Sequence, residues 1–131
     1  MNLASEDVRD MLLSSAAALD LAFGTDLFIG FMPESPDFCV VVYDTGGSDP
    51  DSGKTIYRPH VQVMVRGAVG GYRAAGMLAR SIQVYLKERH NETWNATWYV
   101  GVWGMGDVLF ISHDEKNRPI FSVNFRLQRG A

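Results

Sequence analysis

The chain has 131 residues, of which 47% are hydrophobic and 21% are charged, with 12 Lys and Arg against 15 Asp and Glu. A length near that of one average domain and an ordinary apolar fraction predict a single domain over residues 1–131, and they exclude disordered, collagen-like and coiled-coil chains. The net charge of -3 leaves too little positive charge for a dedicated nucleic-acid-binding protein.

The first predicted element is a helix over residues 6–23, where apolar side chains recur three or four positions apart. We expect Ser5 to cap its first turn and Gly24 to supply the left-handed residue at its end. A strand over residues 27–32 follows, and the Pro-Glu-Ser-Pro segment at 33–36 stops it.

Residues 38–43 (FCVVVY) are β-branched and aromatic, and they predict a central strand covered on both faces. Residues 44–55 contain only turn-forming, polar and charged residues, which predicts a solvated loop of about a dozen residues. Loops of this length in compact domains are mostly functional or disordered, so this loop is a candidate site.

A further strand is predicted over residues 56–66, with Val61, Val63 and Val65 on one face. A glycine-rich break then leads to a second helix over residues 72–89, whose apolar stripe should pack against the sheet. That stripe comprises Ala75, Leu78, Ala79, Ile82, Tyr85 and Leu86.

The remaining segments are read as strands. Residues 90–92 are polar and predict a break, and the aromatic segment 94–103 predicts one strand or a bent pair of strands. The chain then has the pattern of a hairpin, with strands over residues 108–112 and 119–128 joined by the polar turn 114–118. In the last strand one face carries Phe121, Val123, Phe125 and Leu127.

The elements do not alternate strictly between strand and helix, which argues against a doubly wound dinucleotide-binding fold. Each helix has one apolar stripe to bury, and the outer strands have one polar side. The sequence therefore predicts an α+β (α/β two-layer) fold, with a mixed, mostly antiparallel sheet and two helices packed on one face.

Cysteine content and hydropathy limit where the protein works. The single Cys39 excludes an internal disulfide framework and a thiolate zinc cluster, and it is typical of a reducing cytoplasm. No apolar run approaches ~18 residues, and the charged residues Glu6, Asp7 and Arg9 stand where a signal peptide would be apolar. We expect neither secretion nor insertion into a membrane.

Two short patterns in the long loop fail the tests for ligand binding. Residues 53–55 (Gly-Lys-Thr) end like a phosphate-binding loop, but Ser48 stands where that pattern requires glycine and a strand follows in place of a helix. Asp49 and Asp51 are spaced as in a calcium loop, without its downstream bidentate Glu or its flanking helices. We expect a solvated turn and no cofactor.

The three histidines do not form a predicted site. His60 begins a strand, His90 follows a helix and His113 borders a turn, so their spacing predicts neither a metal site nor a general base. Cys39 lies in an apolar strand, where a thiol usually only packs. We predict no catalytic residues and therefore no enzyme.

Arg66 ends a valine-rich strand directly before a glycine-rich segment. There its guanidinium can hydrogen-bond loop carbonyls or a carboxylate such as Asp107, in a structural or interface role, or it can be an exposed strand-end cation. The aromatic residues of segment 94–103 have no basic residues between them, which favours core packing or a protein interface over stacking on single-stranded nucleic acid.

Three segments together resemble a known family. They are residues 59–67 (PHVQVMVRG), the helix over residues 72–87, and residues 106–129 (GDVLFISHDEKNRPIFSVNFRLQR). Their motifs are, in order, Arg66-Gly67 at the end of a strand, Gly106-Asp107 before a strand, the acidic turn 114–118 ending in Arg118, and Asn124-Phe125 in the closing strand. This arrangement is similar to the bacteriophage minor capsid family that includes the tail terminator proteins of long-tailed phages. The polar segment 48–53 departs from the family pattern and resembles an insertion.

The resemblance implies a structural virion protein at the neck, on top of the tail, assembled in the host cytoplasm. Such proteins form a hexameric ring on the last ring of tail tube protein subunits, stop tube growth and present a face to the connector or stopper protein of the head. A globule of this length is about 36 Å across, so six of them edge to edge leave a hole of similar width, enough for duplex DNA. Because the subunit is mildly acidic, we expect double-stranded DNA to pass through without specific binding, and we expect no membrane partner.

The residues expected at interfaces are polar or charged and lie in the long loop, the acidic turn, the last strand and at the end of residues 56–66. They are Arg66, Asp49, Asp51, Lys54, Asp114, Glu115, Lys116, Arg118, Asn124 and Arg126. We predict that the loop 44–53 or the turn 114–118 projects toward the lumen or a neighbouring ring. Ring contacts should be head-to-tail, and an edge strand should dock the tail tube protein.

Two alternatives stay open at this point. Within the same structural class, the protein is a head-completion or other neck protein on the portal side. In a different class, it is a small hydrolase or nucleotide-binding enzyme that uses the three histidines or Lys54.

Overall fold

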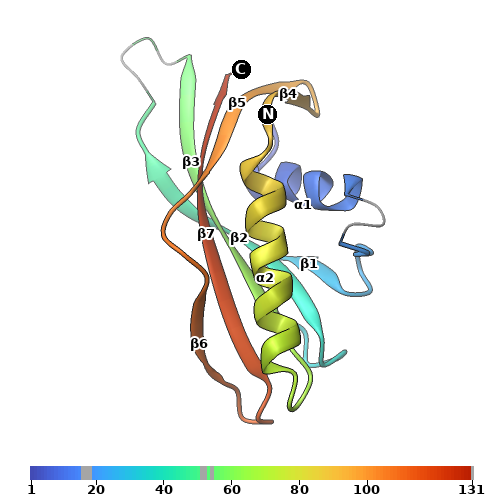
Figure 1. The fold of residues 1–131 in the computed structure, drawn as a ribbon. Helices are drawn as coiled ribbons and strands as arrows, with labels where there is room; N and C mark the ends of the chain where they lie inside the picture. Colours follow the sequence, from blue (N-terminus) through green and yellow to red (C-terminus); the bar gives the residue numbers. More distant parts are fainter. Residues whose placement is uncertain (16–18, 51–52, 54, 131) are drawn as a thin grey trace.

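The computed structural model in Figure 1 describes residues 1–15, 19–50, 53 and 55–130. Over these residues the chain forms two helices and a mixed sheet of seven strands, which confirms the predicted α+β class. In chain order the elements are α1 (Ala4–Ser14), β1 (Leu27–Ile29), β2 (Cys39–Ser48), β3 (Ile56–Arg66), α2 (Tyr72–Lys87), β4 (His90–Trp94), β5 (Thr97–Gly104), β6 (Leu109–His113) and β7 (Pro119–Gly130).

The sheet is organised around β7. The strand order is β1-β2-β3-β7-β5-β4, with β6 also paired to β7. β7 pairs with β3 along one side and with β5 and β6 along the other, and every pair is antiparallel except β1 with β2. The C-terminal hairpin predicted from the sequence is confirmed as β6 and β7.

The core lies between the sheet and both helices. Alternate residues of the central strands face the helices, so Val61, Val63 and Val65 are fully buried, as the alternation predicts. On α2 the predicted stripe is buried at Ala75, Ala79, Ile82 and Leu86, while Leu78 and Tyr85 pack against the core and stay partly exposed. Figure 1 shows α2 lying along the front of the sheet, with α1 beside it.

The first helix is shorter than predicted. α1 ends at Ser14, residues 16–18 lie outside the described residues, and residues 19–23 are not helical. The hydroxyls of Ser14 and Ser15 donate to the carbonyls of Met11 and Leu12, each at 2.6 Å. Serine hydroxyls that bond the backbone in this way compete with the helical pattern, which explains the early end.

Both predicted caps of this helix are also wrong. The residue that precedes the helix is Leu3, whose N–H donates to the Glu6 carboxylate at 2.9 Å. Ser5 is buried inside the first turn, and its hydroxyl donates to Asp44 at 2.6 Å. Gly24 does have a positive φ of 84°, but it serves a turn in which its N–H donates to the Leu27 carbonyl at 2.9 Å.

The strands around the first loops differ in length from the prediction. β1 stops at Ile29, because Gly30 has a φ of 79°, and does not reach residue 32. β2 continues through Ser48, so the first part of the predicted 44–55 loop is strand, paired with β3 across a bulge between Asp44 and Gly47. Gly46 and Gly47 allow this exposed polar segment to form the bulge. Its polar composition alone predicts a loop and not a strand.

The aromatic segment belongs to a hairpin. Residues 90–92 are part of β4 and do not form the predicted break, and the bent pair is β4 with β5. The turn is made by Asn95 and Ala96, which have φ values of 51° and 65°. In the part of the chain that the structure describes, no helix is long and apolar enough to cross a membrane.

Candidate interaction surfaces

The loop at residues 33–37, which we name the anchored loop, is held by Arg66. This side chain is 3% exposed at the end of β3. Its guanidinium donates to the carbonyls of Pro33 at 2.6 Å, Pro36 at 2.8 Å, Asp37 at 2.9 Å and Glu34 at 3.5 Å. Of the predicted alternatives, loop carbonyls are therefore the observed partners of Arg66, and Asp107 is not one.

Arg118 holds the same loop from the β6–β7 turn and is also 3% exposed. It donates to the Asp114 carboxylate at 2.8 Å, the Glu34 carbonyl at 2.8 Å and the Asp37 carboxylate at 3.1 Å. Asp114 in turn accepts from the backbone N–H of Lys116 at 3.0 Å and of Arg118 at 2.9 Å. The acidic turn and the anchored loop therefore form one connected structure.

The charges in this structure neutralise one another. Burial acts to raise the pKa of Asp114, but hydrogen bonds from the backbone and guanidinium of Arg118 and from Lys116 bring that pKa below its usual value. Burial likewise acts against the charge of Arg118, yet Asp114 and Asp37 raise its pKa. Lys116 hydrogen-bonds and ion-pairs with Glu34 and lowers the pKa of that carboxyl. These groups therefore have partners of opposite charge within the subunit.

A cleft of about 320 Å³ lies between the anchored loop and the acidic turn. Glu115 lines it, is exposed, and has no ion-pair partner in the described part of the chain. Arg66 and Arg118 also line the cleft, but their guanidinium groups are already hydrogen-bonded to the anchored loop. These two arginines therefore shape the surface, and Glu115 and Lys116 present polar groups on it.

The other expected interface residues lie elsewhere. Asp49 is exposed just after β2, and Asp51 and Lys54 lie outside the described residues. Asn124 is half-buried on β7, and its carbonyl accepts from Met105 at 2.8 Å. Arg126 is exposed on the sheet face away from the helices, with its guanidinium 5.3 Å from the centre of the Trp103 ring. The structure thus brings together Arg66, Asp114, Glu115, Lys116 and Arg118, and separates them from Asp49, Asn124 and Arg126.

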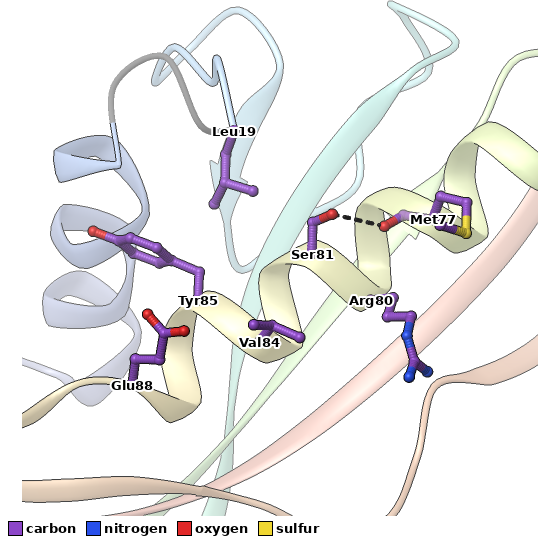
Figure 2. Close-up of a pocket in the computed structure, with 7 residues that line it drawn as sticks. All are labelled: Leu19, Met77, Arg80, Ser81, Val84, Tyr85 and Glu88. Carbon is purple, nitrogen blue, oxygen red and sulfur yellow. Dashed lines mark hydrogen bonds between the residues drawn. The ribbon is translucent and has the colours of Figure 1, made fainter.

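A surface that the sequence did not single out lies on α2. Tyr72, Met77 and Val84 are about half exposed, at 51%, 49% and 52%. An open groove of about 450 Å³ runs beside the helix (Figure 2), lined by Leu19, Met77, Arg80, Ser81, Val84, Tyr85 and Glu88. Met77 and Val84 are seven residues apart and lie on the side of the helix opposite the buried stripe. In the sequence, this apolar pair on an otherwise polar helix face was the only indication of the surface.

A second groove, of about 290 Å³, runs along the other side of the same helix and is lined by Tyr72, Arg73, Gly76, Met77 and Phe121. Gly76 brings the helix close to the sheet, because an added Cβ would lie 3.1 Å from the Phe121 ring. We define the α2 face as Tyr72, Arg73, Met77, Arg80 and Val84. Half-exposed apolar residues gathered in this way are typical of protein contact surfaces.

The structure also contains a buried polar network that the sequence did not reveal. The Tyr99 hydroxyl donates to the fully buried Asp7 carboxylate, which also accepts from the Asn95 amide at 2.7 Å. Arg129 donates to the Tyr99 hydroxyl at 3.1 Å and lies 3.6 Å from Asp7. Burial, followed by the bond to Asp7, raises the pKa of Tyr99. This network ties α1 to the β4–β5 turn and to β7, which is a structural role.

The three histidines lie in three different strands. His60 is in β3, His90 begins β4 and His113 ends β6. No group of three His, Cys, Asp or Glu suited to a metal ion occurs among the described residues. Cys39 is fully buried, and burial raises the pKa of its thiol, which disfavours the reactive thiolate.

A protein family model and a solved structure both match this chain. The model of the family described as bacteriophage tail terminator protein matches residues 16–129. The chain belongs to this family. No curated protein matches it. A solved structure, described as the virion of a native gene transfer agent particle, is similar with a TM-score of 0.76 over 98% of this chain and 96% of that one, at 14% identity. At this identity the likeness shows the fold alone.

Membership of the family confirms the resemblance found in the sequence. The protein is a bacteriophage structural protein of the tail terminator family, and that assignment points away from an enzyme. The surfaces described above are therefore best considered as sites of assembly.

Proposed function

We propose that copies of this chain form a closed hexameric ring on the end of the tail tube, stop its growth and join the tail to the head connector. The observation that carries this proposal is the family match over residues 16–129. This function needs shaped, rigid surfaces and no reactive side chains. The anchored loop, fixed by two buried arginines, is a surface of that kind.

The β6 strand is the element best suited to dock the tail tube protein. Within the described residues β6 pairs only with β7, so its other edge has free backbone donors and acceptors. Leu109 and Ile111 on this strand are 57% and 43% exposed, and no charged residue separates them. An exposed apolar edge strand of this kind is a ready site for pairing with another chain.

Double-stranded DNA passes through the ring lumen in this proposal, without sequence-specific contacts. The net charge of -3 supports this, because strong attraction to phosphates would slow the passage of DNA. In segment 94–103 the Arg126 guanidinium lies 5.3 Å from the Trp103 ring, Arg129 lies 6.0 Å from the fully buried Tyr99 ring, and the Trp98 indole donates to Asn91. One exposed ring beside a cation is less than the basic groove with several stacking platforms that single-strand binding uses.

Deletion of the gene from its phage tests the proposal. We expect tails of uncontrolled length that fail to join heads, seen by negative-stain electron microscopy, and we expect a plasmid copy to restore normal particles. Tails of normal length beside heads that leak DNA would instead identify a head-completion protein and overturn the terminator role.

The same complementation assay addresses the enzyme alternative. Replacing His60, His90 and His113 with Ala should leave the infectious titre within about threefold of wild type, because surface substitutions away from packed sites have small effects. A titre that falls a thousandfold or so with an unchanged fold would point to chemistry at these residues instead.

A further inference from the structure

The charges of this chain are divided along the sequence. From Asp10 to Gly53 it has eight carboxylates and no Lys, Arg or His, whereas eleven of its 12 Lys and Arg lie at or after residue 54. A net charge of -3 therefore conceals a strongly acidic part and a basic part.

The fold places the strands of the acidic part at one end of the sheet, and Leu19 within this part also borders the larger groove beside α2. The acidic part forms the end of α1, the connection to β1, and the strands β1 and β2, which are at one end of the strand order. The basic part forms β3, α2 and the remaining strands. In Figure 1 the β1 strand and its loops lie at the right of the molecule, and β6 lies at the left.

Several of the acidic side chains are already paired within the subunit. Asp10 pairs with Arg9 at 3.0 Å, Asp44 accepts from Ser5, and Glu34 and Asp37 pair with Lys116 and Arg118. Asp20 and Asp26 have no cation partner in the described part of the chain, and they flank Phe23, which is 51% exposed. Phe31, just beyond β1, is 59% exposed. We define the acidic edge as Asp20, Phe23, Asp26 and Phe31.

The α2 face is its counterpart in charge. Arg73 and Arg80 are both exposed, and neither has a carboxylate partner among the described residues. They lie on either side of Met77, which lines both grooves. Figure 2 shows the Arg80 side chain extending away from Leu19, although both residues border the larger groove. The single acid in the larger groove, Glu88, lies at its far end, 3.8 Å from Arg89.

We propose that the acidic edge of each copy docks on the α2 face of the next copy around the ring. This inference rests on the proposed function, since it names the surfaces that close the ring. Two different surfaces that complement each other produce a head-to-tail contact, which closes into a ring when the rotation permits. Contact between two α2 faces would instead oppose Arg73 and Arg80 to themselves, and like charges at an interface are unfavourable.

The apolar residues make the two surfaces complementary in a second way. Phe31 and Phe23 are more than half exposed on the acidic edge, with the Arg9 guanidinium 4.8 Å from the centre of the Phe23 ring, and the α2 face has grooves of about 450 and 290 Å³ bordered by apolar side chains. An aromatic side chain buried in a groove with charged residues around it is the usual arrangement of a strong interface contact. The occupant is therefore a second copy of this chain.

Cross-linking tests which surfaces meet. Cys39 is fully buried, so a variant with Phe31→Cys and Met77→Cys offers two accessible thiols. In particles from a deletion phage complemented by this variant, a bismaleimide reagent should produce a ladder of bands from dimer to hexamer. Each single variant should give only the monomer band on a denaturing gel. Dimers alone would show a symmetric contact, and the absence of cross-links would show that the surfaces do not meet. Either result overturns the proposal.

Charge reversal provides an independent test that needs no reagent. Arg73→Glu and Arg80→Glu should each lower the complemented titre at least about tenfold, with thermal unfolding unchanged, because both lie at the contact. Arg58→Glu is the matched control: it makes the same change of charge at a half-exposed residue of β3 that belongs to neither surface, and it should leave the titre within about twofold. Full complementation by both helix variants overturns the proposal.

The two proposals fail differently. Normal tail length after gene deletion would overturn the proposed function. Uncontrolled tails after deletion, together with wild-type behaviour of Arg73→Glu and Arg80→Glu, would keep the terminator role and remove only this assignment of the ring contact.

Discussion

The anchored loop and the tip of the β2–β3 hairpin (residues 45–50) have similar sequences and opposite environments. Both are rich in Pro, Ser, Gly or acidic residues and contain no cation. The anchored loop has its carbonyls bonded by Arg66 and Arg118, whereas the hairpin tip is exposed throughout and its Asp49 has no ion-pair partner in the described chain. Order in a polar loop is therefore decided by distant cations, here about 30 and 80 residues away in sequence, and not by the loop's own composition.

The strongest test of this comparison is Arg66→Ala. It leaves buried carbonyls of the anchored loop without a donor, so the free energy of unfolding should fall by about 3 kcal/mol in chemical denaturation. Arg66→Lys keeps the charge with fewer and differently placed donors and should recover part of this loss. A loss below about 0.5 kcal/mol for the Ala variant would mean that the loop is ordered by other contacts.

A smaller effect is expected at the hairpin. Gly47 has a φ of 134°, and an added Cβ would overlap the Arg58 carbonyl and lie 2.8 Å from Pro59 Cα. Gly47→Ala should cost about 1–2 kcal/mol, limited because the exposed tip can open locally. Hydrogen exchange at the Arg58 amide should report the opening. The control is Gly46→Ala, which has a φ of 91° with nothing within 4 Å, and which should cost only the backbone strain.

The pH dependence of stability provides a third test. The pKa of Asp114 is lowered in the folded state, so its stabilising contribution is complete above the unfolded pKa, near ~4, and is lost as the pH falls through the lower folded value. Wild type should therefore be more stable than Asp114→Asn at pH 6, and the difference in Tm should vanish toward pH 2. A constant difference over this range would contradict the assignment.

The smallest effect is expected at Asp49. Because its side chain is exposed and has no ion-pair partner in the described chain, Asp49→Ala should change the free energy of unfolding by less than about 0.5 kcal/mol. A loss of complementation by this stable variant would support the interface role proposed for the hairpin tip. Marked destabilisation would show that the tip is anchored after all.

Elements with a clear hydrophobic period were predicted well. β3, α2 and the last hairpin were located because Val61, Val63 and Val65, and the stripe from Ala75 to Leu86, alternate with polar residues at the correct spacing. The first helix was predicted to end too late because apolar residues continue past Ser14. The spacing of apolar residues carries no information about serine hydroxyls that bond the backbone. Residues 90–92 of β4 were predicted as a break because a short exposed edge strand needs no apolar pattern.

The surfaces were harder to predict than the fold. Arg66 was recognised from its position at a strand end, and carbonyl binding was one of its predicted options. Its convergence with Arg118 on one loop depends on β3 lying beside β7, which a sequence pattern does not specify. The α2 face and the Asp7–Tyr99–Arg129 network likewise join residues from distant segments, so only the three-dimensional arrangement reveals them.

The position of β7 has a consequence for synthesis. Of the described strands it is the last to leave the ribosome, yet it is the one that pairs with β3, β5 and β6. A nascent or truncated chain therefore has three strands with unsatisfied edges, a state prone to aggregation and proteolysis. Quality control should remove such fragments before they reach a growing tail, so that only finished subunits compete for the particle.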